Sequence, residues 1–271
     1  MNHLGHRCVL FDCLLFFDAL KLYVEVNNMK VLASDFDGTI FFKDHVKDED
    51  VKAVKAFQKE GNLFGLCTGR PLIGITKYIK EDIVFDFYII STGAVILDKD
   101  LNALYEKTIS RKTVQAIIDK YKKQTRIMIQ ADREIYAFDN KKAMEIEYLL
   151  KTLDDLKTDQ IFSVSLECVD EVIAREICED IKNSFSDVDA FQNTNYIDVV
   201  PMGCSKGVGI KMLKEMLKID TIAGIGDSYN DIPMLDTVDD SFTFNNSPEI
   251  VKQHADMCVD SVAEAISILM K

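Results

Sequence analysis

Two aspartates, separated by one residue, follow the first strongly apolar run of the chain in the segment Ser34-Asp35-Phe36-Asp37-Gly38-Thr39. In a strand, residues two apart project to the same face, so we expect Asp35 and Asp37 to point together beyond its carboxyl end. Neighbouring carboxylates repel each other unless a cation binds or one of them is protonated, and both arrangements serve chemistry. The alternative is an Asp-Gly turn in which Asp35 has no connected role.

A second acidic loop, Gly226-Asp227-Ser228-Tyr229-Asn230-Asp231, also follows an apolar strand. In an open parallel sheet, ligands collect beyond the carboxyl ends of the strands, so the two loops can face a shared crevice. Carboxylate oxygens without histidine or cysteine partners suit a hard cation, and Mg²⁺ is the usual choice beside phosphate. The two loops therefore predict a Mg²⁺ site that makes an acidic crevice attractive to an anion.

Two further segments supply donors for an anion. Thr68-Gly69-Arg70 ends the second predicted strand, where a hydroxyl and a helix-start backbone N–H can hold an anionic group. Lys206, at the start of a predicted helix, can reach the same crevice as a point charge for phosphate. Taken singly, each is typical of a helix cap or a solvated charge. Their combination with the acidic loops favours a phosphate site.

The composition excludes several other functions. The 271 residues include 45 acidic and 32 basic side chains, which gives a formal net charge of −13. This sign opposes the phosphate backbone of nucleic acids, so we expect no nucleic-acid partner. The seven cysteines contain no Cys-x-x-Cys pair, which argues against a disulfide framework or structural zinc site and favours a reducing, cytoplasmic location. The four histidines are also scattered, so zinc chemistry is not expected.

The elements that must position these residues alternate between short apolar strands and amphipathic helices. This alternation predicts an α/β domain with a doubly wound, Rossmann-like parallel sheet that is covered on both faces. The expected strands are 31–36, 62–67, 87–91 and 221–225, and the expected helices are 48–60, one opened by Pro71, 205–217 and 262–269.

The middle of the chain changes character and predicts an inserted α+β domain. Its expected elements are a hairpin over 95–109, helices over 114–121, 141–153 and 172–181, and strands over 126–130, 134–138 and 161–167. The predicted division is a core domain of residues 29–91 and 196–271, interrupted by the inserted domain at 92–195. Both junctions are expected to act as hinges.

Residues 1–28 precede the first predicted strand. Their apolar stretch 8–20 contains Asp12 and Asp18 and is shorter than the roughly 20 residues that span a bilayer, so we expect no membrane anchor. An export signal is not expected either, because no small-x-small cleavage pattern follows. We expect residues 1–28 to be either a poorly ordered extension or the product of a start codon assigned too early.

Together these segments resemble the haloacid dehalogenase (HAD) superfamily of phosphatases, in particular the Cof-like branch with a type-IIB cap, from about Met29 onward. The four motifs of that superfamily occur in order as Asp35-x-Asp37-Gly38-Thr39, Thr68-Gly69-Arg70, Lys206 and Gly226-Asp227-x-x-Asn230-Asp231. The inserted domain resembles the cap of that branch. Two segments differ from the branch: Thr92-Gly93-Ala94 stands where Asn-Gly-Ala is usual, and Asn245-Asn246-Ser247 where Gly-Asn-Ala is common.

The resemblance implies a role for each motif residue. Asp35 would be the nucleophile that forms an aspartyl-phosphate, while Asp37 would protonate the leaving oxygen and later activate water. Mg²⁺ would be bound by the Asp35 carboxylate, the Asp37 backbone carbonyl and Asp227. Asp231 would orient Lys206 or metal-bound water. The implied phosphate-binding groups are Thr68, Lys206, Asn230 and backbone N–H groups near Phe36 and Gly69.

The function implied by the resemblance is Mg²⁺-dependent hydrolysis of a small phosphomonoester, with sugar phosphates as the first expectation and phosphorylated cofactors such as flavin or pyridoxal phosphates next. One alternative is a sugar-phosphate mutase of the same superfamily, which returns the phosphoryl group to its substrate. Another is a non-catalytic phospho-acceptor regulatory module. Four polar residues of the insertion are expected to be solvated rather than to face substrate, namely Arg126, Gln130, Arg133 and Asn195. The sequence indicates no oligomeric state.

Overall fold

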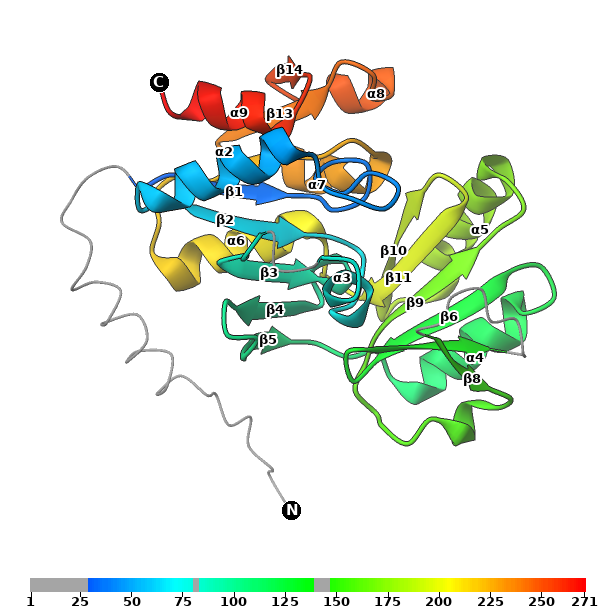
Figure 1. The fold of residues 1–271 in the computed structure, drawn as a ribbon. Coiled ribbons are helices and arrows are strands. Elements are labelled where there is room, and N and C mark those ends of the chain that lie inside the picture. The colour runs from blue at the N-terminus through cyan, green and yellow to red at the C-terminus, as the bar shows by residue number, and fades with distance from the viewer. Residues whose placement is uncertain (1–28, 80–82, 139–146) are drawn as a thin grey trace.

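The computed structural model describes residues 29–79, 83–138 and 147–271, so the predicted extension 1–28 lies outside the described residues. The described chain forms two β-sheets, each with its own helices and hydrophobic core (Figure 1). Within these residues, no helix is both long enough and apolar enough to cross a membrane.

The larger sheet contains eight strands. They are β1 (Val31–Ser34), β2 (Leu63–Cys67), β3 (Phe87–Ile90), β4 (Val95–Asp98), β5 (Ala103–Glu106), β12 (Ala223–Ile225), β13 (Asp240–Phe244) and β14 (Met257–Val259), in the spatial order β14-β13-β12-β1-β2-β3-β4-β5. The strands from β14 to β3 are parallel, and β4 and β5 add an antiparallel hairpin at one edge. In Figure 1, β1, β2 and β3 point toward the smaller sheet, so their carboxyl ends face it.

Helices cover both faces of the larger sheet. Buried side chains of α2 (Asp48–Lys59) and α9 (Val262–Leu269) pack on one face, and those of α6 (Lys206–Leu217) and α7 (Ile232–Leu235) on the other (Figure 1). The short helices α3 (Ile73–Thr76) and α8 (Glu249–Lys252) complete the domain. Helix α2 ends just before Gly61, whose φ of 85° is readily adopted only by glycine. The predicted doubly wound sheet is therefore confirmed.

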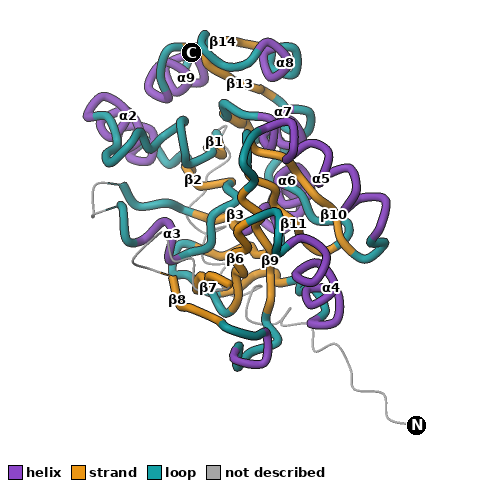
Figure 2. Tube along the Cα trace, turned by 90° about the vertical axis from the view of Figure 1, so that its right-hand side faces the viewer, coloured by secondary structure: helices purple, strands orange, loops and turns teal. Residues whose placement is uncertain are grey.

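The smaller sheet belongs to the inserted domain. Its strands are β6 (Arg126–Ala131), β7 (Glu134–Phe138), β8 (Glu147–Leu150), β9 (Ile161–Glu167), β10 (Val188–Asn193) and β11 (Tyr196–Pro201), in the order β10-β11-β9-β6-β7-β8. Figure 2 shows α4 (Arg111–Tyr121) and α5 (Glu171–Ser184) on the same side of this sheet, where both contribute to its apolar core. The other side of the sheet faces the larger domain.

The structure moves both predicted boundaries of the insertion to higher residue numbers. The hairpin β4–β5 pairs with β3 in the larger sheet, so the insertion begins after Glu106 rather than at residue 92. Strand β11 pairs with β9 and β10 in the smaller sheet, so the insertion ends near Pro201 rather than at residue 195. Sheet membership depends on pairing between distant segments, which local composition does not reveal.

One predicted helix is wrong in the part that the structure describes. The helix expected over 141–153 lies partly outside the described residues, but 147–150 form β8, which pairs in parallel with β7 at the edge of the smaller sheet. The sequence Glu-Tyr-Leu-Leu fits either structure, because short apolar runs do not distinguish helix from strand. Pairing with β7 decides between them.

Candidate active site

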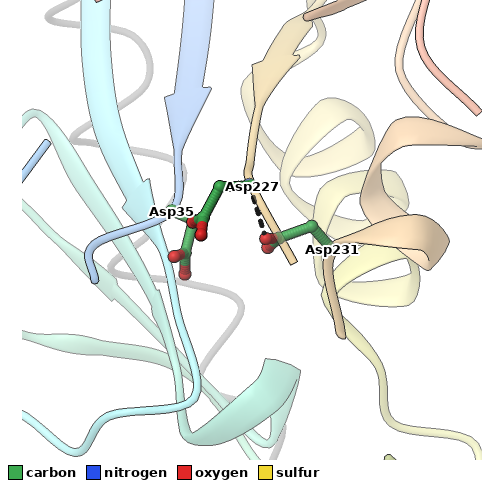
Figure 3. A group of neighbouring side chains, drawn as sticks. All are labelled: Asp35, Asp227 and Asp231. Carbon is green, nitrogen blue, oxygen red and sulfur yellow. Dashed lines mark hydrogen bonds between the residues drawn. The ribbon is translucent and has the colours of Figure 1, made fainter. Parts of the chain in front are cut away.

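The acidic loops that follow β1 and β12 meet because these strands are parallel neighbours. Ser34 pairs with Ile225, and the backbone N–H of Asp35 donates to the carbonyl of Ile225 at 2.9 Å. Oxygens of Asp35, Asp227 and Asp231 lie within 4.8 Å of one another (Figure 3). The structure therefore brings together carboxylates that are almost 200 residues apart in the sequence.

Lys206 bridges two carboxylates of this group, those of Asp35 and Asp231. Its side chain is fully buried, and its Nζ donates to Oδ1 of Asp35 at 2.6 Å and to Oδ1 of Asp231 at 2.5 Å. The residue is the first of α6, and Ser205 caps that helix by accepting from the N–H of Val208. Burial alone would lower the pKa of Lys206, but Asp231 and Asp35 raise it above its ordinary value, so this lysine is a permanent cation.

Asp231 organises the second acidic loop. While Oδ1 of Asp231 accepts from Lys206, Oδ2 accepts from the backbone N–H groups of Asp227 and Ser228, each at 3.0 Å. A Cβ at Gly226 would lie 2.4 Å from Cγ of Asp231, so only glycine fits there. Because both of its oxygens are engaged by the protein, Asp231 holds the loop and Lys206 in place.

The carboxylates carry more negative charge than Lys206 neutralises. Burial, and next the charge of Asp231, raise the pKa of Asp35 well above its ordinary value despite the bond to Lys206. The same two causes raise the pKa of Asp227 to about 6. Clustered carboxylate oxygens without histidine or cysteine partners are the donor set of a hard divalent cation, and such an ion would remove the repulsion. The residues present therefore fit Mg²⁺.

Asp37 lies apart from this cluster, although it lines the same cavity as Asp35. Its two carboxylate oxygens accept from Nε and Nη2 of Arg70 at 2.6 and 2.7 Å. Strand β1 ends at Ser34, so the alternation that predicts a shared direction for Asp35 and Asp37 does not extend to them. Both carboxylates nevertheless line one cavity beyond the strand, and that of Asp37 is paired with Arg70.

Arg70 is held firmly in place. Its Nη1 donates to the carbonyl of Gly74 at 2.6 Å, and its guanidinium lies over the rings of Phe36 and Tyr78, with 5.0 and 5.2 Å to the ring centroids. A guanidinium with two parallel bonds to a carboxylate fixes the direction of that carboxylate. Arg70 therefore sets the orientation of Asp37 in this structure.

The remaining predicted phosphate-binding side chains line one cavity of about 440 Å³. Thr68 and Asn230 are 2% and 5% exposed and lie in its wall, as does Gly69. Phe36 is fully buried, and its carbonyl accepts from the N–H groups of Ile40 and Phe41, which shapes the turn after β1. Thr68 and Asn230 thus line the same cavity as Asp35.

The insertion forms the roof of this cavity with the polar face of its sheet. Alternate residues of β6, β9 and β11 point to the apolar core that α4 and α5 cover. The residues between them line the cavity, namely Arg126, Met128, Gln130, Ser165, Glu167, Tyr196 and Asp198. Asp198 is buried, which raises its pKa, and it accepts from Ser165 and from Thr92 of the larger domain.

Two of the four polar residues expected to be solvated are not. Arg126 and Gln130 lie in the cavity wall, because both occupy the polar face of β6. Arg133 donates to the carbonyl of Leu101, and Asn195 donates to the carbonyl of Cys168, so neither faces the cavity. The expectation is thus wrong for Arg126 and Gln130.

Sequence reasoning missed four contributors to the site. They are Thr39, whose hydroxyl donates to Oδ1 of Asp227 at 2.8 Å, and Arg70, Gln130 and Asp198. Thr39 and Arg70 lie within the motif segments, so the sequence could have indicated that they belong to the site. Asp198 contacts Gly69 so closely that a Cβ there would lie 2.5 Å from its Oδ2. Nothing in the local sequence of Asp198 indicates that contact.

A doubly wound core, an inserted cap and an acidic crevice lined by phosphate-type donors define the class of cap-covered phosphatases. Comparison with known families agrees: the chain belongs to the haloacid dehalogenase-like hydrolase family, whose sequence model matches residues 32–269. The resemblance drawn from the four motifs is confirmed, and the chain is an HAD-type phosphatase of the Cof-like branch.

Individual relatives place the chain within this family. A protein of Mycoplasma capricolum without an assigned function is 30% identical over 76% of this chain and 87% of its own length. The 5-amino-6-(5-phospho-D-ribitylamino)uracil phosphatase YcsE of Bacillus subtilis is 24% identical over 88% of this chain and 92% of its own length.

Solved structures share the whole fold, cap included. The subclass IIB sugar phosphatase BT4131 superposes with a TM-score of 0.76 at 19% identity, over 89% of this chain and 99% of that one. A haloacid dehalogenase-like hydrolase from B. subtilis gives a TM-score of 0.78 at 18% identity, over 89% and 99%. These superpositions confirm the fold of the predicted type-IIB cap.

Proposed function

We propose that this phosphatase hydrolyses small phosphomonoesters with the help of Mg²⁺ and through an aspartyl-phosphate on Asp35. The observation that carries the proposal is the buried convergence of Asp35, Lys206, Asp227 and Asp231 beneath a cap-covered cavity. The carboxylates of Asp35 and Asp227 and the backbone carbonyl of Asp37 would hold Mg²⁺. When bound, the ion neutralises negative charge on the phosphoryl oxygens.

The first half-reaction transfers the phosphoryl group to Asp35. Oδ1 of Asp35 is held by Lys206, which leaves Oδ2 to attack phosphorus while the bond to the leaving oxygen breaks. The donors around the phosphoryl group would be the Thr68 hydroxyl, the Asn230 amide, Lys206 and the backbone N–H groups near Phe36 and Gly69. Positioning and neutralisation of charge account for most of the acceleration in phosphoryl transfer.

Asp37 would supply the proton for the leaving oxygen and then take one from the attacking water. In this structure both of its oxygens accept from Arg70, which fixes the direction of the carboxylate. Hydrolysis of the aspartyl-phosphate then returns Asp35 to its carboxylate form and frees inorganic phosphate.

The cavity restricts the substrate to small molecules. A volume of about 440 Å³ under a roof of side chains admits a phosphorylated metabolite but no folded protein or nucleic acid. Sugar phosphates and phosphorylated cofactors both fit, and the relative that acts on a phosphoribitylamino-uracil supports small polyhydroxylated esters. The five cysteines of the described chain are free thiols, which supports a cytoplasmic location.

Turnover of p-nitrophenyl phosphate tests the proposal. Activity should require Mg²⁺ and disappear with EDTA, and Asp35→Asn should lose turnover while Asp100→Asn, on the exposed β4–β5 turn, keeps it. Acid quenching should trap a phosphoenzyme that hydroxylamine cleaves. An Asp35→Asn protein with full activity would refute the assigned nucleophile, and transfer to a second hydroxyl of the substrate without release of phosphate would favour a mutase.

A further inference from the structure

The side chain of Gln130 joins the cap to the loop that contains Thr68. Its Nε2 donates to the backbone carbonyl of Gly69 at 3.0 Å and lies 3.4 Å from Oγ of Ser165. Gln130 lies on β6 of the cap and is only 5% exposed, whereas Gly69 belongs to the core domain. The bond therefore joins the two domains at the wall of the cavity, where loss of the partner of a partly buried carbonyl is costly.

The peptide group between Gly69 and Arg70 connects this bond to Thr68. In a trans peptide, the carbonyl and the following N–H point in opposite directions, and the described residues contain no cis peptide. Because the carbonyl of Gly69 turns toward Gln130, the N–H of Arg70 turns toward Thr68. The Thr68 Oγ1 accepts from that N–H at 3.2 Å.

Because the Thr68 hydroxyl oxygen accepts this bond, its proton is free to be donated to a ligand. A hydroxyl has one proton to donate, and an oxygen that already accepts from an N–H presents that proton elsewhere. No acceptor for the Thr68 proton occurs in the described part of the chain, and Thr68 lines the cavity together with Asp35. A phosphoryl oxygen is the acceptor that this arrangement suits.

Gly69 cannot hold its own peptide in this orientation. Glycine has no Cβ to restrict rotation of the adjoining peptides, and no larger residue fits here because a Cβ would lie 2.5 Å from Oδ2 of Asp198. The cap thus both requires glycine at this position and supplies, through Gln130, the bond that orients its carbonyl. We infer that Gln130 is a positioning residue which, by fixing the Gly69–Arg70 peptide, makes the Thr68 hydroxyl a donor to the phosphoryl group.

This inference rests on the proposed function and is tested by binding of ligands that have no leaving group. Gln130→Met keeps the length of the side chain but removes the donor. Competitive inhibition by inorganic phosphate and by orthovanadate should weaken about tenfold, the change that corresponds to one lost hydrogen bond. A residue that contacts only the leaving group would leave both inhibition constants unchanged, so unchanged constants would overturn the inference.

A double-mutant cycle with Thr68→Val gives the sharper test. If Gln130 acts through the Thr68 hydroxyl, Gln130→Met should change the inhibition constants less than twofold once that hydroxyl is gone. Equal losses with and without the hydroxyl would overturn the relay. Gln130→Glu, which removes the same donor, serves as a second variant if Gln130→Met does not fold by circular dichroism.

Gln192→Met is the matched control. Gln192 is also a cap glutamine whose Nε2 donates to backbone carbonyls, those of Glu171 and Thr194 at 2.8 Å, but both partners lie within the cap. Its inhibition constants should equal those of the wild type, and a tenfold loss in this variant would overturn the specific role of Gln130. A wild-type protein that releases no phosphate and binds no vanadate would instead refute the proposed function.

Discussion

The acidic cluster makes stability depend on pH in an unusual direction, and Asp227→Asn isolates the effect. Burial, and next the charge of Asp231, raise the pKa of Asp227 from its ordinary 3.8 to about 6. Because the folded state binds this proton more tightly than the unfolded state, the stabilisation is complete below pH 3.8 and is lost as the pH rises through about 6. A shift of about two pKa units corresponds to about 3 kcal/mol.

Asn at position 227 can still accept from the Thr39 hydroxyl but does not titrate. In EDTA, the free energy of unfolding of Asp227→Asn relative to the wild type should therefore increase by about 2.4 kcal/mol between pH 4 and pH 7. At pH 7, Mg²⁺ at 100 times its dissociation constant should stabilise the wild type by about 2.7 kcal/mol and the variant far less. Bound Mg²⁺ would thus offset the repulsion among the buried carboxylates, and this offset would appear as added stability of the folded wild type.

Urea denaturation followed by circular dichroism, with and without Mg²⁺, measures both quantities, and Asp100→Asn is the control for loss of an exposed carboxylate. A difference between Asp227→Asn and the wild type that stays constant from pH 4 to pH 7 in EDTA would refute the electrostatic reasoning. Equal stabilisation of both proteins by Mg²⁺ would place the cation elsewhere.

Three further changes test the site. Lys206→Met should lower the free energy of unfolding by about 3–5 kcal/mol in urea denaturation, because it leaves the partners of a buried ion pair uncompensated; a loss below 1 kcal/mol would contradict this. Arg70→Lys cannot form two parallel bonds to Asp37 and should lower kcat more for an alkyl phosphate than for p-nitrophenyl phosphate. An alkoxide is the poorer leaving group and needs a proton from Asp37 more than p-nitrophenolate does. Equal losses of kcat for the two substrates would contradict the positioning role of Arg70. Gly69→Ala should raise KM and lower the denaturation midpoint in urea through the clash with Asp198, and an unchanged midpoint would contradict the close contact.

The part of the site that could be predicted from the sequence is the part that local pattern specifies. An apolar run followed by Asp35, and another followed by Asp227, each indicate a strand whose carboxyl end bears a carboxylate. Right-handed, parallel connections then place such ends at one edge of a sheet. Only the pairing of β1 with β12 was needed to bring the two carboxylates together.

The parts that failed depend on contacts between distant segments. Residues 147–150 read equally well as helix or strand until β7 pairs with them, and the hairpin 95–106 joins the core sheet only because β3 offers an edge. The pairing of Asp37 with Arg70 was not predicted for a similar reason, since the two residues are distant in the sequence and meet only in the folded chain. Each error marks a place where tertiary pairing outweighs local preference.

In the cap, the sequence predicts the two faces of a strand but not what each face contacts. In β6, Ile127 and Ile129 alternate with Arg126 and Gln130, so the existence of one apolar and one more polar face was readable. The alternation does not predict which part of the protein contacts the polar face of β6. In this fold that face meets the loop after β2, and Gln130 consequently bonds the carbonyl of Gly69 instead of water. By the inference drawn above, this contact makes a cap residue part of phosphate binding, so we expect a substitution at Gln130 to alter phosphate affinity.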